Sequence, residues 1–143
     1  MGNLPHAVPL WIDPSQETYY LTFCCEPRGK NQLAVPDAAK AILETIEHRQ
    51  NEHVWHVHLF LLMPDHAHAL MTFPPGRLPF RTRLSKWKEW TAKTIRIQWQ
   101  LDFFEHRLRS EESLREKADY ILHNPVRAGL ASKASDWPHV WLP

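Results

Sequence analysis

The stretch from His53 to Phe73 constrains the fold most, because two apolar runs flank the turn Met63-Pro64-Asp65. Strand side chains alternate between the two faces of a sheet, so a hairpin through this turn fixes which residues share a face. We expect one face to carry the apolar side chains Trp55, Val57, Leu59, Leu61, Ala67, Ala69, Met71 and Phe73. The opposite face then carries the four histidines His56, His58, His66 and His68.

Elements on either side of this hairpin complete a recognisable order. The patterns predict a strand over Tyr19–Cys25, a helix from Pro36 to about Gln50, a helix over Leu84–Gln98 and a strand over Leu101–Leu108. Strand, helix, strand, strand, helix, strand is the order of α+β, ferredoxin-like folds, with a four-stranded antiparallel sheet and two helices on one face. Two helices cover only one face, so we expect the histidine-bearing face to be open.

Length and composition favour one domain. The chain has 143 residues, and we expect a loose, proline-rich arm over residues 1–16 followed by a single domain over residues 17–143. Cys24 and Cys25 are adjacent, which fits neither a redox motif nor a zinc knuckle and favours reduced thiols in the cytoplasm. No apolar run is long enough for a membrane span, and no signal peptide is predicted.

A basic segment lies within a chain of formal net charge +1. Seven Lys and Arg side chains between Arg77 and Arg96 are opposed only by Glu89, while tryptophans at helical spacing form the face expected to pack in the core. Such a patch either binds phosphate groups or is simply a solvated helix face. The candidates for nucleic-acid contact are Arg81, Arg83, Lys86, Lys93 and Arg96.

The last predicted helix has an N-cap at Ser110 and ends at Asn124-Pro125. Leu114, Ala118, Ile121 and Leu122 form its apolar stripe, and Tyr120 lies on the far side of the helix from the centre of that stripe. If this added helix lies on the open face of the sheet, the Tyr120 hydroxyl comes close to a histidine pair. The alternative is an exposed tyrosine without a role.

Two His-x-His pairs compete for such a site. His66 and His68 project to one face of a strand, as do His56 and His58, and neutral imidazole is a common metal ligand. Each pair is half of a metal centre, and periodicity does not choose between them. A metal beside a tyrosine hydroxyl and a phosphate could promote phosphodiester cleavage, with phosphate oxygens and water completing the coordination of Mg²⁺ or Mn²⁺.

Segment 63–68 (Met-Pro-Asp-His-Ala-His) and segment 120–130 (Tyr-Ile-Leu-His-Asn-Pro-Val-Arg-Ala-Gly-Leu) together resemble the paired signature of the REP-associated tyrosine transposases. This family lies in the single-tyrosine HUH-type superfamily. Segments 20–23, 103–109 and 136–138 also match in order, so the resemblance spans about residues 17–140.

The resemblance implies a transposase that cuts and rejoins single-stranded hairpin DNA at repetitive extragenic palindromes. Tyr120 would be the nucleophile that forms a 5′-phosphotyrosine adduct. His66 and His68 would be metal ligands in preference to His56 and His58, and Asn124 would be the third ligand from the helix that carries Tyr120, with His123 as its substitute. The metal would be Mg²⁺ or Mn²⁺.

The chain departs from the family at Asp65, where Asn is common, and in a C-terminus that lacks a serine pair after Trp137. Two other functions are compatible with the sequence: a domesticated module that grips hairpin DNA without cutting, and an RNA-binding ferredoxin-like domain. The latter would want stacking aromatics where this chain has histidines. A monomer is favoured over a homodimer.

Overall fold

The computed structural model describes residues 17–109 and 111–143. The predicted loose arm over residues 1–16 and the predicted N-cap at Ser110 lie outside the described residues. The elements are β1 (Thr18–Cys24), α1 (Pro36–Asn51), β2 (His56–Leu62), β3 (His66–Thr72), α2 (Phe80–Thr94), β4 (Phe104–Leu108), α3 (Glu111–Leu122), α4 (Asn124–Arg127), a 3₁₀ turn η1 (Ala134–Asp136) and β5 (Val140–Trp141). In the described part of the chain, no helix is long and apolar enough to cross a membrane.

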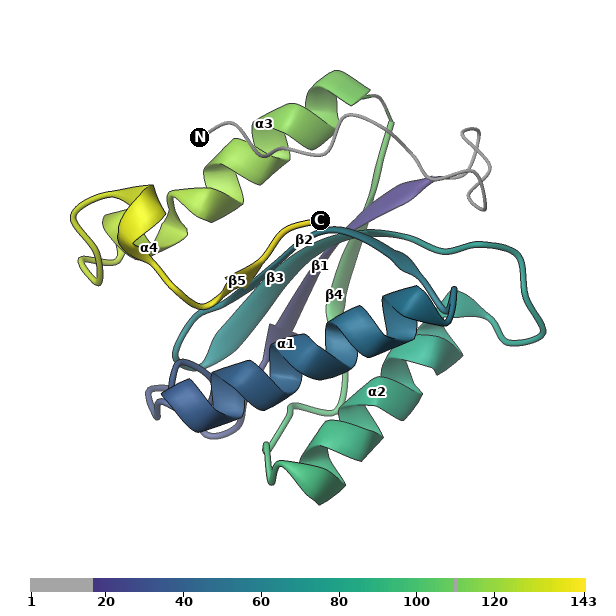
Figure 1. Ribbon diagram of the computed structural model, residues 1–143, viewed down its shortest axis with the longest axis horizontal. Helices are drawn as coiled ribbons and strands as arrows, with labels where there is room; N and C mark the ends of the chain where they lie inside the picture. The colour runs from purple at the N-terminus through teal and green to yellow at the C-terminus, as the bar shows by residue number, and fades with distance from the viewer. Residues whose placement is uncertain (1–16, 110) are drawn as a thin grey trace.

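The five strands form one antiparallel sheet in the order β4-β1-β3-β2-β5 (Figure 1). The first four strands of this order reproduce the predicted ferredoxin-like sheet, so the α+β class is confirmed. β5 is an addition to the prediction, and it extends the sheet at the β2 edge, where Phe60 pairs with Trp141. This edge is also closed by a hydrogen bond from Leu62 N to His139 O of 2.9 Å.

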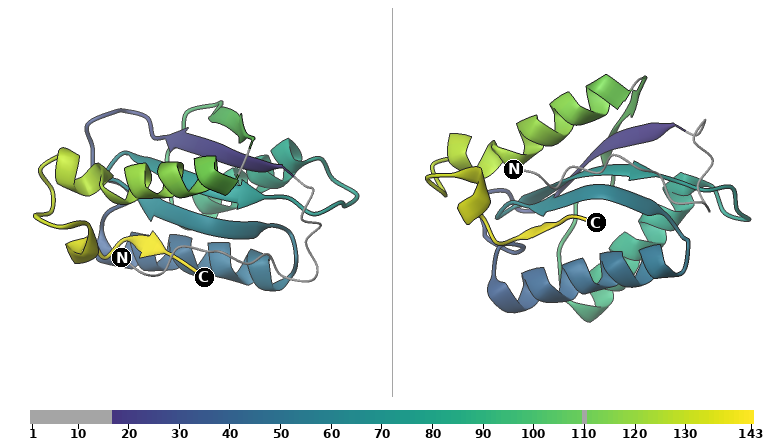
Figure 2. Two further views of the ribbon diagram at one scale, coloured as in Figure 1. Left: turned by 90° about the horizontal axis from the view of Figure 1, so that it is seen from above. Right: turned by 45° about the horizontal axis from the view of Figure 1, so that its top comes forward.

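Helices α1 and α2 lie on one face of the sheet, and α3 lies on the other (Figures 1 and 2). α1 begins at Pro36, where a missing N–H costs nothing, and Asp37 lies in its positively polarised first turn. Its buried side chains Ile42 and Ile46 pack with Phe23, Trp87 and residues of β2 and β3 in the larger of two hydrophobic cores. The prediction of two helices covering one face is therefore confirmed.

A β-bulge at His58 overturns one detail of the predicted hairpin. Val57 pairs with Met71, but the next pair is Leu59 with Leu70, so His58 is the extra residue. The extra residue exchanges the two faces of β2. Leu59 and Leu61, expected beside the helices α1 and α2, instead join the second core, while Phe60 and Leu62 take their places.

The face that carries the histidines is partly covered, contrary to the open face that was expected. The second core joins Ile121 and Leu122 of α3 with Leu59 and Leu70 of the sheet, and Trp137 packs at its margin. The two helices between strands do leave this face open, and α3, the added last helix, is the element that covers it. α3 buries its stripe on this face and leaves Tyr120, on the other side of the helix, 56% exposed.

Several predicted boundaries also shift. α2 begins at Phe80 after Pro79, four residues earlier than expected, and ends before Arg96, whose φ of 69° no α-helix accommodates. His53 has a φ of 60° and lies outside β2, and β4 is shorter than its predicted range. The final helix is divided, because Asn124 belongs to the separate short helix α4.

Candidate active site

The His66 and His68 rings lie side by side on the α3 face of β3, with their centroids 4.9 Å apart. His66 Nδ1 is 2.8 Å from Asp65 Oδ1. An ionised carboxylate only accepts hydrogen bonds, so His66 donates through Nδ1–H and Nε2 is the nitrogen left to ligate a metal. A carboxylate behind a ligating imidazole is a common arrangement in metal sites.

Asp65 is itself fixed by the loop after β1. Its Oδ2 accepts hydrogen bonds from Arg28 Nε at 2.9 Å and from the Gly29 backbone N–H at 2.8 Å. The guanidinium of Arg28 is the main cause that holds the pKa of Asp65 well below its ordinary value, and hydrogen bonds from His66 and Gly29 add to the effect. Asp65 is therefore a carboxylate at neutral pH, and several hydrogen bonds together fix its orientation toward His66.

His68 is held by two hydroxyl groups of β1. Its Nδ1 is 3.1 Å from Thr22 Oγ1 and 3.2 Å from the Tyr20 hydroxyl, so two hydroxyl groups lie within hydrogen-bonding distance of this nitrogen. Burial is the main cause that lowers the pKa of His68 to about 4, and the charges of His66 and Arg127 lower it further. The imidazole is thus neutral at pH 7, which is the form that binds metals.

The rival pair, His56 and His58, lies at the other end of the same face. His58 Nε2 is 2.8 Å from Thr72 Oγ1, six residues along β3 from His66, a separation of roughly 20 Å at strand rise. Both rings are buried, and burial followed by the charge of His56 lowers the pKa of His58 to about 3. The two pairs therefore cannot ligate one ion.

Tyr120 and Tyr20, the residue that contacts His68, share Lys117 as a neighbour, and among the described residues no hydrogen bond joins the Tyr120 hydroxyl to a histidine. Lys117 Nζ is 5.9 Å from the Tyr120 ring centroid and 5.4 Å from that of Tyr20, the residue that contacts His68. Arg127 Cζ is 3.9 Å from the Tyr120 ring centroid on the C-terminal side. α3 thus leaves Tyr120 exposed to solvent, as its position off the apolar stripe indicated, and α3 itself packs on the sheet face that carries the histidines.

Asn124, the proposed third ligand, is the first residue of α4 and is partly buried. Its substitute His123 is exposed, and its Nδ1 lies 2.8 Å from the carbonyl oxygen of Asp119, which turns the ring back along α3. Within residues 17–109 and 111–143, no three His, Cys, Asp or Glu side chains form a ready-made metal cluster. A centre on His66 and His68 would accordingly need an amide such as Asn124.

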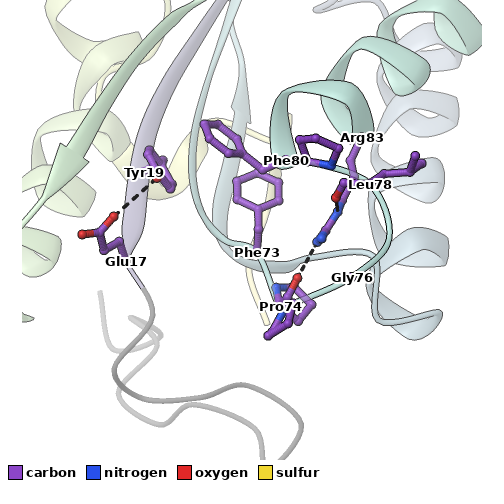
Figure 3. Close-up of a pocket in the computed structure, with 10 residues that line it drawn as sticks. Glu17, Tyr19, Phe73, Pro74, Gly76, Leu78, Phe80 and Arg83 are labelled. Carbon is purple, nitrogen blue, oxygen red and sulfur yellow. Dashed lines mark hydrogen bonds between the residues drawn. The ribbon is translucent and has the colours of Figure 1, made fainter.

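Helix α2, which carries most of the predicted basic residues, lies on the other face of the sheet from α3, the helix that contains Tyr120 (Figure 1). Arg83 hydrogen-bonds to the carbonyl oxygens of Val54, Leu78 and Pro74, and it fixes the loop around the aromatic pocket in Figure 3. Arg81 forms ion pairs with Asp102 and Glu105. Lys86, Lys93 and Arg96 are exposed, so these three are the available cations of the predicted set.

Sequence reasoning missed several residues around the histidines. The side chains in question are Tyr20, Thr22, Arg28, Phe104, Lys117 and Arg127. Phe104 is 56% exposed at the sheet edge, 6.1 Å from the Tyr20 ring. The alternation along residues 20–22 could have placed Tyr20 and Thr22 on the histidine face, but the partners of Arg28 and Arg127 depend on tertiary contacts.

No protein-family model matches the chain. A REP-associated tyrosine transposase of Escherichia coli (strain K12) is 32% identical over 84 residues, which are 57% of this chain and 51% of that protein. A provisionally named REP-associated tyrosine transposase of Haemophilus influenzae (strain Rd) is 27% identical over 139 residues, 85% of this chain and 77% of that protein. The match thus spans about half the length of the first relative.

Solved structures agree in fold. The structure of a REP-associated tyrosine transposase bound to a REP hairpin superposes with a TM-score of 0.74 at 24% identity, covering 95% of this chain and 81% of that one. A provisionally named transposase from Deinococcus radiodurans has a TM-score of 0.50 at 14% identity, over 82% of this chain and 95% of that one.

The fold is an α+β domain with the architecture of the solved REP-associated tyrosine transposase. The sequence matches confirm the resemblance, and the chain is similar to the REP-associated tyrosine transposases of Escherichia coli and Haemophilus influenzae.

Proposed function

We propose that this protein is a metal-dependent transposase that cleaves and rejoins single-stranded hairpin DNA through a tyrosine adduct. The observation that carries the proposal is the exposed Tyr120 on α3, the helix that packs on the sheet face carrying two imidazoles whose Nδ1 atoms already have partners. The relatives support the substrate class, because one solved relative was bound to a REP hairpin.

In the proposed reaction, the Tyr120 hydroxyl oxygen attacks the scissile phosphorus. An O–P bond to Tyr120 forms as the bond to the 3′-oxygen breaks, giving a 5′-phosphotyrosine and a free 3′-hydroxyl, with the phenol proton passing to solvent and the 3′-oxygen taking one from water. Attack by a 3′-hydroxyl on the adduct reverses the step and rejoins the strand. No net hydrolysis is needed.

His66, His68 and Asn124 would hold the metal, and the donor set fits one. Two imidazoles and an amide oxygen would leave coordination positions for phosphate and water oxygens, which Mg²⁺ and Mn²⁺ prefer. The bound ion would act as a Lewis acid on the phosphate. Asp65, Thr22 and Tyr20 would keep the two rings in place during the reaction.

The hairpin itself is the expected partner, bound by one copy of the chain. Lys86 and Lys93 on α2 and Arg96 just after it are exposed cations that could contact phosphates of a stem or flank that reaches past the sheet edge. Arg81 and Arg83 were also predicted to contact DNA, and they could do so only by giving up the bonds described above.

The test is incubation of the protein with end-labelled, single-stranded hairpin oligonucleotides, with and without Mn²⁺. We expect metal-dependent cleavage, which His66→Ala abolishes and His56→Ala preserves, with thermal melting to verify that both variants fold. Equal loss of cleavage in two folded variants would show that the wrong pair was chosen. Hairpin binding without cleavage by the wild type would instead identify a non-cutting DNA-binding module.

A further inference from the structure

Tyr120 is flanked by two cations that form no ion pair with a carboxylate of the described residues. Arg127 Cζ lies 3.9 Å from its ring centroid and Lys117 Nζ lies 5.9 Å from it. The ion pairs found among the described residues involve other side chains. Two positive charges beside one tyrosine ring, without an ion-pair partner in the described part of the chain, make this place attractive to an anion.

Both cations are also linked to the surroundings of His68. Arg127 donates a hydrogen bond from Nη2 to the Tyr120 carbonyl oxygen, which ties α4 back to α3. Its charge acts on His68, where it contributes to the lowered pKa after burial and His66. Lys117 Nζ lies 5.4 Å from the centroid of Tyr20, whose hydroxyl contacts the same histidine. The cations thus lie close to both Tyr120 and His68.

The geometry points to a phosphodiester-binding site made by Lys117 and Arg127, in which Arg127 contacts the scissile phosphate as a catalytic residue. The ligand class is a single negatively charged phosphodiester of DNA. A planar guanidinium can donate two parallel N–H bonds to phosphate oxygens, whereas an ammonium acts as a point charge. Arg127 therefore holds the phosphate in line with the hydroxyl, and Lys117 adds electrostatic attraction. This inference rests on the proposed function.

The first test measures the single-turnover rate of adduct formation at saturating hairpin oligonucleotide with Mn²⁺. Arg127→Gln is expected to slow the reaction on the order of 100-fold, since removing one preorganised donor at a reacting oxygen typically costs about that much. Arg127→Lys should recover about a tenth of the wild-type rate or more, and Lys117→Gln should slow it by roughly tenfold or less. The exposed Lys133→Gln, outside both sites, is the matched control and should react at the wild-type rate.

Melting temperature separates this role from a structural one, because Arg127 is exposed and each variant should melt within a few degrees of wild type. Equal slowing by Arg127→Gln and Arg127→Lys would mean that Arg127 only positions Tyr120. A rate for Arg127→Gln within twofold of wild type would overturn the inference outright.

A second measurement keeps this inference distinct from the proposed function. In a Tyr120→Phe background, the affinity for the same oligonucleotide is measured between about 50 and 200 mM salt. Arg127→Gln and Lys117→Gln each remove one phosphate contact. Each should therefore lower the magnitude of the slope of log affinity against log salt concentration by about 0.7 to 1. If wild type forms no adduct but the slope changes as expected, the proposed nuclease function is refuted and the phosphate-binding site is retained. An unchanged slope would refute the site.

Discussion

Replacing Asp65 with alanine is expected to weaken metal binding at His66 and His68 without unfolding the protein. Asp65 accepts from His66 Nδ1 at 2.8 Å, and without it the ring is free to rotate and to place its proton on Nε2, the proposed ligand atom. Loss of such an outer-shell partner typically costs about 10- to 100-fold in metal affinity. That range corresponds to about 1.4–2.7 kcal/mol.

The stability cost should be smaller than the number of bonds suggests. Arg28 is 53% exposed on its side chain, so water replaces much of its interaction with Asp65. The Gly29 N–H and His66 lose one acceptor each, and both can reach solvent or rearrange. We expect a loss of about 1–2 kcal/mol in the free energy of unfolding.

Calorimetric titration with Mn²⁺ near pH 7.5 measures the affinity, and urea denaturation measures stability. Asp37→Ala, on the exposed first turn of α1, is the matched control because it removes a carboxylate far from the histidines in sequence and structure. An affinity of Asp65→Ala for Mn²⁺ within twofold of wild type would refute the orienting role. An equal loss in Asp37→Ala would show that net charge, rather than orientation, sets the affinity.

Three further predictions concern single side chains. Lys88 is buried and donates to the carbonyl oxygens of Gln100, Leu101 and Asp102. Lys88→Met should therefore lower the free energy of unfolding, measured by urea denaturation, by about 2–3 kcal/mol. A loss under about 0.5 kcal/mol would contradict this. The pKa of buried His58 is lowered to about 3, so between pH 6.5 and 4 the unfolded chain takes up a proton that the folded one does not. Stability should therefore fall on acidification, by up to about 1.4 kcal/mol per pH unit from this residue, and urea denaturation of His58→Leu across that range should give a shallower slope; an unchanged slope would refute it. Phe104→Leu should weaken binding of single-stranded DNA about fivefold or more through lost base stacking, while Phe104→Trp and the exposed control Leu101→Ala should not; fluorescence anisotropy distinguishes these outcomes.

The sequence predicts the order of strands and helices along the chain and the helix-covered face of the sheet well, because both depend on local periodicity. Alternation over β2 and β3 and helical spacing over α1 are properties of neighbouring residues. The bulge at His58 is different, since an extra residue becomes visible only when β2 is paired with β3. Its consequence, the exchange of Leu59 with Phe60, could not be read from alternation alone.

Elements that depend on tertiary contacts were also missed. β5 has two residues, and it is a strand only because β2 offers its edge and Trp137 Nε1 donates to Leu62 O at 2.9 Å. The start of α2 was also missed, but its cause is local: Pro79, with an extended ψ of 154°, is the N-cap residue that precedes Phe80.

The candidate ligands could be named from the sequence, but the residues that support them could not. Tyr120 was expected off the apolar stripe, and the structure leaves it exposed on the helix that packs on the histidine-bearing face. Arg28 is 37 residues from Asp65, and no local pattern joins them. The roles of His66, His68, Tyr120 and Asn124 stay predictions, as does the choice of Mg²⁺ or Mn²⁺.

The central claim is tested most directly by asking which atom of the protein becomes joined to DNA. Wild type and Tyr120→Phe are incubated with Mn²⁺ and a hairpin oligonucleotide, and the products are separated under denaturing conditions and mapped by peptide mass spectrometry. The loss of one hydroxyl from an exposed ring leaves the fold and the contact with Arg127 in place. The account predicts a phosphotyrosine at Tyr120 in wild type and no adduct in Tyr120→Phe; an adduct retained by Tyr120→Phe, or none in wild type, would contradict it.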